Sequence, residues 1–207
     1  AVGLPVISTR QKGATEIMTP GQEGFILDDP CDVSALASAI RTVLDADIRT
    51  YLPYVPDLGH KITVRHLILH TSGLRDQWSL FSIGGQNTEG RVTQQQIVNM
   101  VSRQQGLNFT PGTEYLYCNT GYTLLAEIVF KVSGKTLREF TTERIFKPLG
   151  MDRTFFFDDV TEIVPHRANS YAKRRDKDGK ETAVWERGLL NYDNVGATSL
   201  VTTVEDL

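Results

Sequence analysis

The sequence contains little cysteine, no long apolar run and no large excess of either charge. Its two cysteines, Cys31 and Cys118, stand far apart among 207 residues and do not form the framework of a disulfide-rich domain. No apolar run approaches the roughly 18 residues of a membrane-spanning helix, so we predict no membrane segment in this chain. The formal net charge of -3 gives no electrostatic basis for binding nucleic acid, and we expect no such partner. With 40% hydrophobic and 23% charged residues, the composition is that of a globular chain.

The start of the sequence has no methionine and no charged or apolar leader. Ala1 opens a stretch that is typical of a buried strand, where a natural chain rarely begins. We therefore expect the sequence to be an excerpt or an incomplete reading frame. The localisation of the parent protein stays open for the same reason.

The first 45 residues have the pattern of short strands followed by a helix. Apolar runs at residues 6–7 and 25–27, bounded by glycine, proline and aspartate, predict buried parallel strands. Asp32 is placed to cap a helix, and one buried face of that helix is predicted from Val33, Leu36, Ile40, Val43 and Leu44. The pattern changes beyond Asp47. This change predicts a junction near residues 44–49 and two units, residues 1–45 and 46–207.

The larger unit is predicted to be mainly helical. The sequence after Thr63 predicts a helix that turns three apolar side chains inward, those of Val64, Leu67 and Ile68. Two capping boxes predict later helix starts, namely Thr93 with Gln96 and Thr136 with Glu139. Residues 120–133 form the most apolar of the predicted helices, and Gly134 ends it. This helix is expected to lie in the core.

Four motifs follow one another along the larger unit. The stretch at residues 61–74 ends in His-Thr-Ser-Gly-Leu, and a Pro-Gly-Thr turn then precedes Tyr117-Cys118-Asn119. Lys-Pro-Leu-Gly follows at residues 147–150 and Gly-Ala-Thr-Ser-Leu-Val at residues 196–201. In this order the motifs resemble those of the serine β-lactamase and penicillin-binding-protein-like hydrolases, the branch that includes class C β-lactamases, D-aminopeptidases and related esterases. The resemblance begins near Asp47 and continues to the end of the chain.

The resemblance implies a fold class and a site. The expected fold is α/β with an α+β tendency, in which a Rossmann-like βαβ remnant precedes a partial β-lactamase-like helical region. In such hydrolases a serine attacks the carbonyl carbon of an amide or ester and forms an acyl-serine. By resemblance, Tyr117 is the base that takes the proton of the serine. This role requires nearby ammonium groups, because a phenol ordinarily titrates near about 10.

Asn119 is the second site residue that the resemblance implies. Its amide would donate to the carbonyl of the substrate and accept from the lysine of a Ser-x-x-Lys element. The implied partner is a small-molecule or peptide substrate, and no cofactor or metal is implied. A lone Tyr-x-Asn is more commonly a packing aromatic beside a capping asparagine. Here the turn before it and Gly121-Tyr122 after it favour descent from catalytic positions.

The sequence lacks the nucleophile that this chemistry needs. No Ser-x-x-Lys precedes Tyr117, and no Lys-Thr-Gly-type strand follows it. The Ser-x-x-Lys formed by Ser170 and Lys173 comes after Tyr117, in a polar stretch that we expect to form a solvated hairpin or loop. Ser72 stands directly before a glycine without a Gly-x-Ser-x-Gly elbow, which is typical of a turn residue. We therefore expect a hydrolase by descent that is inactive in this chain.

Residues 1–45 resemble a different family of enzymes. Gly-Leu-Pro-Val at residues 3–6 and Gly-Gln-Glu-Gly-Phe-Ile-Leu at residues 21–27 are similar to the C-terminal domain of GT-B-type, family 4-like glycosyltransferases. Glu16 falls where that family carries Gly-Gly-x-x-Glu, but one glycine is missing, so we do not expect this part to bind a sugar nucleotide. Two alternatives to a hydrolase therefore stay open: a glycosyltransferase fragment with a misjoined tail, and a non-catalytic binding module.

Overall fold

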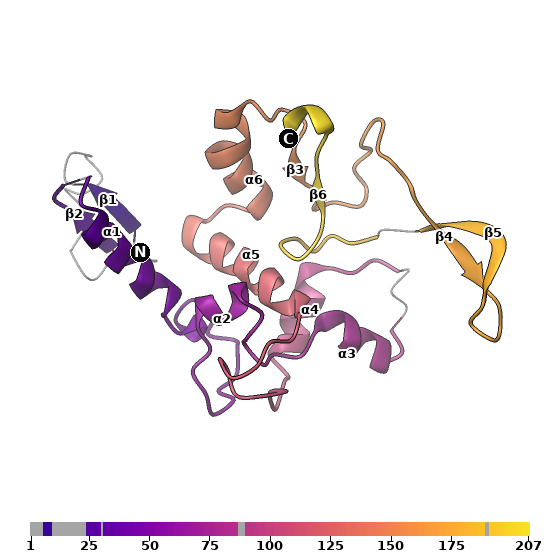
Figure 1. Ribbon diagram of the computed structural model, residues 1–207, viewed down its shortest axis with the longest axis horizontal. Coiled ribbons are helices and arrows are strands. Elements are labelled where there is room, and N and C mark those ends of the chain that lie inside the picture. Colours follow the sequence, from indigo (N-terminus) through magenta and orange to yellow (C-terminus); the bar gives the residue numbers. More distant parts are fainter. Residues whose placement is uncertain (1–5, 10–23, 30, 87–89, 189–190) are drawn as a thin grey trace.

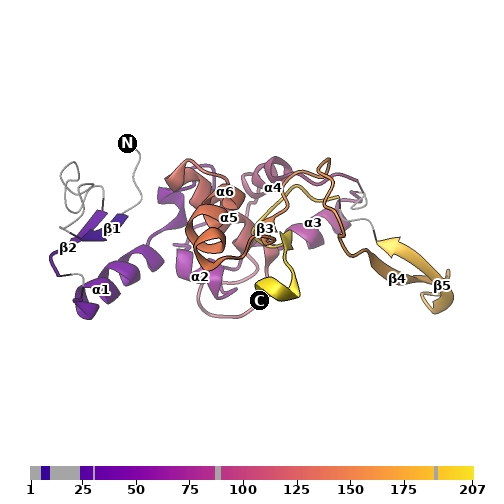
Figure 2. The ribbon, with the colours of Figure 1, turned by 90° about the horizontal axis from the view of Figure 1, so that it is seen from above.

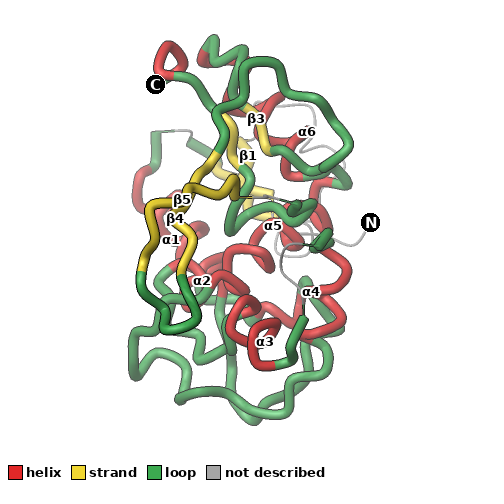
Figure 3. The backbone as a smooth tube through the Cα atoms, turned by 90° about the vertical axis from the view of Figure 1, so that its right-hand side faces the viewer, coloured by secondary structure: helices red, strands yellow, loops and turns green. Residues whose placement is uncertain are grey.

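The described residues form helices and three two-stranded sheets, which confirms the expected mixed class. The computed structural model describes residues 6–9, 24–29, 31–86, 90–188 and 191–207. A small parallel sheet and helix α1 lie at one end of the molecule, and a long hairpin, β4–β5, lies at the other (Figures 1 and 2). Helices α2 to α6 lie between these ends. Helices and loops make up far more of the backbone than strands do (Figure 3).

The N-terminal strands form the parallel pair that the sequence predicts. Strand β1 (Val6–Thr9) pairs in parallel with β2 (Gly24–Leu27), with Ile7 opposite Phe25. Helix α1 (Val33–Leu44) follows and contacts β2. The segment that joins the two strands, including Glu16, lies outside the described residues.

Helix α1 begins as predicted, but most of its apolar face is not buried. The carboxylate of Asp32 accepts a hydrogen bond from the N–H of Ala35 and caps the helix. Val33 is 77% exposed and Ile40 is 43% exposed, so the prediction that these side chains are buried is wrong. The physical reason is the small size of the neighbouring elements. Strand β2 and the short helix α2 contact α1, and they do not cover a helix of about three turns.

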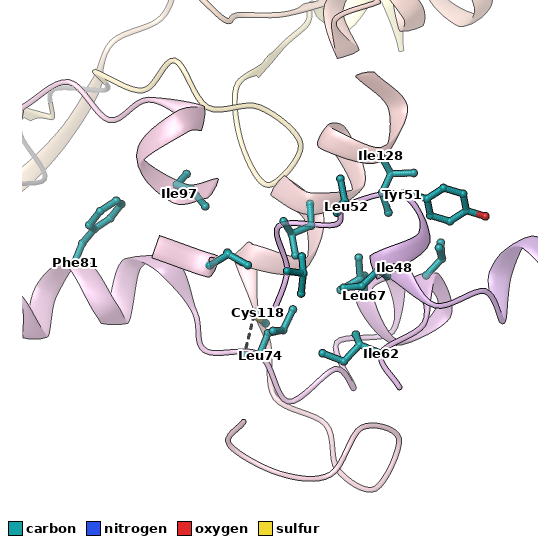
Figure 4. Packing of buried hydrophobic residues seen from close by; sticks show 14 of the residues in the cluster. Ile48, Tyr51, Leu52, Ile62, Leu67, Leu74, Phe81, Ile97, Cys118 and Ile128 are labelled. Atoms are coloured by element: carbon teal, nitrogen blue, oxygen red, sulfur yellow. Dashed lines mark hydrogen bonds between the residues drawn. The ribbon is translucent and has the colours of Figure 1, made fainter. Parts of the chain in front are cut away.

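The core lies around helix α5 (Asn119–Ser133), which contacts four other helices. These are α2 (Val64–Ile68), α3 (Gln77–Ile83), α4 (Gln94–Val101) and α6 (Leu137–Thr141). Figure 4 shows ten labelled core side chains: Ile48, Tyr51, Leu52, Ile62, Leu67, Leu74, Phe81, Ile97, Cys118 and Ile128. Leu124 in the middle of α5 is fully buried. Gly134 ends the helix in the left-handed conformation, with φ of 68°, as predicted.

The predicted helix starts are present, with one error in the expected burial. Thr63, Thr93 and Thr136 each cap a helix, and the last two form the predicted capping boxes. At α2 the prediction holds for Val64 and Leu67, which are buried, whereas Ile68 is 37% exposed. Ile68 lies on the same face as Val64, four residues earlier, but it is the last residue of this five-residue helix, where the covered part of that face ends.

The C-terminal region contains short helical turns, a short two-stranded ladder and a hairpin. Short helical turns η3 (Thr142–Phe146) and η4 (Lys147–Leu149) lead to β3 (Phe155–Phe156), which pairs antiparallel with β6 (Leu200–Val201). Strands β4 (Ser170–Arg175) and β5 (Glu181–Gly188) form the predicted solvated hairpin, since β4 is exposed along its whole length. Two other short turns are η2 (Ile48–Thr50) and η5 (Val204–Asp206).

Candidate functional site

The structure brings Tyr117 and Asn119 together at the N-terminus of α5. Asn119 is the first residue of the helix, and Cys118 occupies the N-cap position without a side-chain capping hydrogen bond. The Tyr117 side chain is 58% exposed, so its phenol is open to solvent. The positive end of the helix dipole favours negative charge at this place. In the described part of the chain, no hydrogen bond joins a lysine or arginine to the Tyr117 phenol.

His70 holds the backbone and the ring of this motif. The N–H of Cys118 donates to Nδ1 of His70 at 3.2 Å. The imidazole ring packs against the ring of Tyr117 at 4.6 Å between centroids and against that of Tyr122 at 5.1 Å. Because Nδ1 accepts, a neutral imidazole must carry its proton on Nε2. His70 itself has a positive φ of 57°, a conformation that few residues other than glycine adopt.

Asp76 holds the other end of the motif. One carboxylate oxygen, Oδ2, accepts from the backbone N–H and from the side-chain Nδ2 of Asn119, each at 2.7 Å. The other oxygen, Oδ1, accepts from the N–H groups of Trp78 and Ser79 and thereby caps α3. The start of α3 and the start of α5 are therefore joined through one carboxylate.

The segment before α3 runs along the first turns of α5. Thr120 donates from Oγ1 to the carbonyl oxygen of Arg75 at 2.9 Å, and Thr123 donates to Oε1 of Gln77 at 2.9 Å. Gly73 lies at the tightest point, since a Cβ there would overlap the carbonyl oxygen of Phe109. Residues 70–77 thus support the Tyr-x-Asn motif.

Cys118 is unsuited to replace the missing serine. Its side chain is 3% exposed, and its thiol donates to the carbonyl oxygen of Leu74 at 3.3 Å, which Figure 4 marks. Burial raises the pKa of the Cys118 thiol above its usual value. Since the thiolate is the nucleophilic form, this thiol is held in its unreactive state.

The two serines considered as nucleophiles lie where the sequence predicts, away from any catalytic arrangement. Ser72 is 1% exposed, and its Oγ accepts from the N–H of Leu74 within its own turn. Ser170 and Lys173 lie on strand β4 rather than on a helix. Residues three apart on a strand point to opposite faces, and Lys173 pairs with Glu181 at 3.6 Å. These two residues therefore cannot form a serine–lysine pair.

A large cleft lies elsewhere. Its volume is about 850 Å³, and it lies beside the β3–β6 ladder with Arg153, His166 and Arg167 among its lining residues. Neither Tyr117 nor Asn119 lines it. Within the described ranges, no group of three or more histidine, cysteine or acidic side chains could hold a metal ion. No helix in these ranges is both long enough and apolar enough to cross a membrane.

Two residues that matter for this geometry, His70 and Asp76, were not predicted as site residues. In the stretch that contains His70, the sequence predicted only that Ser72 is a turn residue. The position of Asp76 before a helical run is a signal for an N-cap. Its second contact, to Asn119, lies 43 residues away along the chain and leaves no local signal.

Comparison with known proteins decides the family. A family model described as Beta-lactamase matches residues 33–207. The chain belongs to the beta-lactamase family. This confirms the resemblance to β-lactamase and penicillin-binding-protein-like hydrolases. The match begins at Val33, the first residue of α1, and the assignment of residues 1–45 to a glycosyltransferase stays a prediction.

Several known proteins are similar to this chain. A D-aminopeptidase of Brucella anthropi is 35% identical over 125 residues, which is 58% of this chain and 24% of the relative. The structure of the D-amino acid amidase from Ochrobactrum anthropi SV3 is 28% identical with a TM-score of 0.61, over 83% of this chain and 49% of the amidase. A penicillin-binding protein homologue from Pyrococcus abyssi is 26% identical with a TM-score of 0.60, over 79% and 37%. The chain thus spans about a quarter of the length of the curated relatives it matches.

Proposed function

We propose that residues 46–207 are part of a serine hydrolase domain that cleaves amide bonds through an acyl-serine. The substrate class is an amide of a small D-amino acid or peptide, by analogy with the D-aminopeptidase and the D-amino acid amidase. Tyr117 is the base for the attacking serine, and Asn119 orients the carbonyl group. Ester cleavage by the same acyl-serine chemistry is the alternative within this class.

One observation carries the proposal: an exposed phenol and an asparagine amide lie two residues apart at the N-terminus of the core helix. A serine hydroxyl becomes nucleophilic when a neighbouring base takes its proton during attack. A phenolate at a helix N-terminus is in a favourable field for that role. The asparagine amide supplies a donor for the carbonyl oxygen, on which negative charge develops.

The 207-residue chain itself is proposed to be inactive. It contains no Ser-x-x-Lys before Tyr117, and Ser72 and Ser170 are unsuited to the role. We expect no covalent labelling of this chain by a fluorophosphonate or a penicillin probe. Stoichiometric labelling of Ser72 or Ser170, located by mass spectrometry, would contradict this part of the proposal.

The activity is tested in an extended chain, defined as this chain joined to a Ser-x-x-Lys helix before it and a Lys-Thr-Gly-type strand after it. We expect the extended chain to form an acyl-serine and to hydrolyse D-phenylalanine amide faster than the L form. A matched variant with alanine in place of the added serine is the control. If the extended chain folds and neither substrate nor probe acylates the added serine, the proposed function is wrong.

A second candidate concerns residues 1–45, the glycosyltransferase fragment. The parallel pairing of β1 with β2, followed by α1, favours a βαβ-type origin for this unit. We propose the boundary at residues 45–46 and expect no binding of a sugar nucleotide by this unit. Calorimetric titration with a uridine or guanosine diphosphate sugar measures this binding. Saturable binding would favour the glycosyltransferase over the hydrolase as the active part. If neither activity is found, a non-catalytic binding module is the third candidate.

A further inference from the structure

Both carboxylate oxygens of Asp76 accept hydrogen bonds, and those from Asn119 fix the orientation of its side-chain amide. A carboxylate can only accept hydrogen bonds, so the atom of the asparagine amide that faces it must be the nitrogen. This settles the orientation of the amide, with Nδ2 at 2.7 Å from Oδ2 of Asp76. Among the hydrogen bonds of the described residues, Oδ1 of Asn119 has no partner. One N–H of the amide is taken by Asp76, and the other remains for a ligand.

We propose that Asp76 is a positioning residue for Asn119, and this proposal rests on the proposed function of that residue. In the orientation that Asp76 fixes, the carbonyl oxygen of the Asn119 amide can accept a hydrogen bond from a cation. The second N–H of the amide can donate to the carbonyl oxygen of a substrate. Without Asp76, the amide is free to rotate by half a turn and to exchange these two groups.

The contacts of Asp76 exclude a direct chemical role for its carboxylate. Four N–H groups donate to its two oxygens: two from Asn119, one from Trp78 and one from Ser79. Hydrogen bonds to an ionised acceptor are about twice as strong as those between neutral groups, so they restrict the amide effectively. Asp76 acts through Asn119 and does not itself touch the reacting atoms.

The test uses hydrogen exchange and the side-chain amide signals of the 207-residue chain, observed by NMR. The first N–H groups of a helix have no partner within that helix, so protection of the Asn119 N–H reports its bond to Asp76. In Asp76→Ser the serine hydroxyl still caps α3, because serine is as good an N-cap as aspartate. We expect exchange at Asn119 to become at least about tenfold faster, which corresponds to about 1.4 kcal/mol. The signal of the Nδ2 proton that Asp76 binds should move upfield, towards the position of a solvated amide proton, and Trp78 and Ser79 should stay protected.

Two further variants keep the test decisive. Asp32→Ser changes another aspartate N-cap, that of α1, and should leave the signals of Asn119 unchanged. Asp76→Asn keeps one oxygen for α3 but turns a donor towards the donors of Asn119, so it should reproduce the loss at Asn119.

Unchanged exchange and unchanged side-chain signals at Asn119 in both Asp76 variants would overturn the proposal. Equal losses at Asn119, Trp78 and Ser79 in both variants would also overturn it, since Asp76 would then be a helix cap only. These signals need no acylation, so a failure here is distinct from failure of the extended chain to form an acyl-serine.

Discussion

The imidazole ring of His70 packs against the phenol ring of Tyr117 with 4.6 Å between the ring centroids. The same imidazole accepts the backbone N–H of the next residue, Cys118. One side chain therefore fixes both the ring and the main chain of the motif on which the proposed chemistry depends. Three aromatic rings surround it, those of Tyr115, Tyr117 and Tyr122.

His70→Ala should destabilise the chain more than the same substitution does at a histidine with a similar backbone conformation. His166 is the matched control, since it also has a positive φ, 60°, but is exposed. Both alanine variants carry the same cost of the left-handed conformation, and the difference isolates the ring contacts and the hydrogen bond. We expect His70→Ala to lower the free energy of unfolding by about 1–3 kcal/mol more than His166→Ala. Urea titration followed by circular dichroism checks it, and equal midpoints would show that the ring contacts contribute nothing.

Tyr117→Phe tests the proposed base in the extended chain. The variant removes only the phenolic oxygen, so folding should be nearly unchanged while the acylation rate falls by roughly 10²- to 10⁴-fold, the usual effect of a positioned proton-transfer group. Tyr115→Phe is the matched control, because Tyr115 also contacts the His70 ring and is exposed. Tyr122 is less suitable, since its hydroxyl donates to the carbonyl oxygen of Ile68. Equal acylation rates for the two variants in stopped-flow experiments would make Tyr117 a packing residue.

The stability of the chain should fall in mild acid because of His66. Its Nδ1 accepts the N–H of Thr63 in the capping box of α2. Burial lowers the pKa of the His66 imidazole below its usual 6.5, and the neighbouring charges of Arg65 and Lys61 act in the same direction, against the opposing effect of Asp45. The unfolded chain therefore takes up the proton first as the pH falls. The free energy of unfolding should decrease from about pH 6.5 downward and level off below the folded pKa.

His66→Gln separates this effect from other titrations. Glutamine at the third helical position keeps the capping-box hydrogen bond but does not titrate. Urea midpoints measured between about pH 8 and about pH 5 should fall less in His66→Gln than in the parent. Parallel curves for the two proteins would exclude His66 as the source.

Gly73→Ala should be far more harmful than Gly134→Ala. Both glycines have positive φ values, 71° and 68°. A Cβ on Gly134 meets no atom within 4 Å, whereas a Cβ on Gly73 would overlap the Phe109 carbonyl oxygen. We expect Gly134→Ala to cost about 1–2 kcal/mol, from the backbone conformation alone. Gly73→Ala should cost about 1–3 kcal/mol more. Thermal unfolding of both variants measures the difference, and similar midpoints would mean that the Phe109 loop gives way without cost.

Local signals in the sequence predicted local structure. Thr93 with Gln96 and Thr136 with Glu139 mark real helix starts, because a capping box needs only residues three apart. Burial was predicted less well: Val33 and Ile40 have the spacing of a buried face, but burial depends on a partner that periodicity does not describe. The contact of Asp76 with Asn119 joins residues on two different helices, so no local pattern encodes it. The roles of Tyr117 and Asn119 stay predictions that the proposed experiments test.

The burial of Cys118 gives the chain an internal reporter for the site. Cys31 is exposed and Cys118 is buried, so an alkylating reagent should modify the first at once and the second only when the Tyr117 region opens. The alkylation rate of Cys118, measured relative to that of Cys31, would show how often the start of α5 separates from residues 70–77. A series of mass spectra over time would thus follow the opening of the site without any need for a substrate.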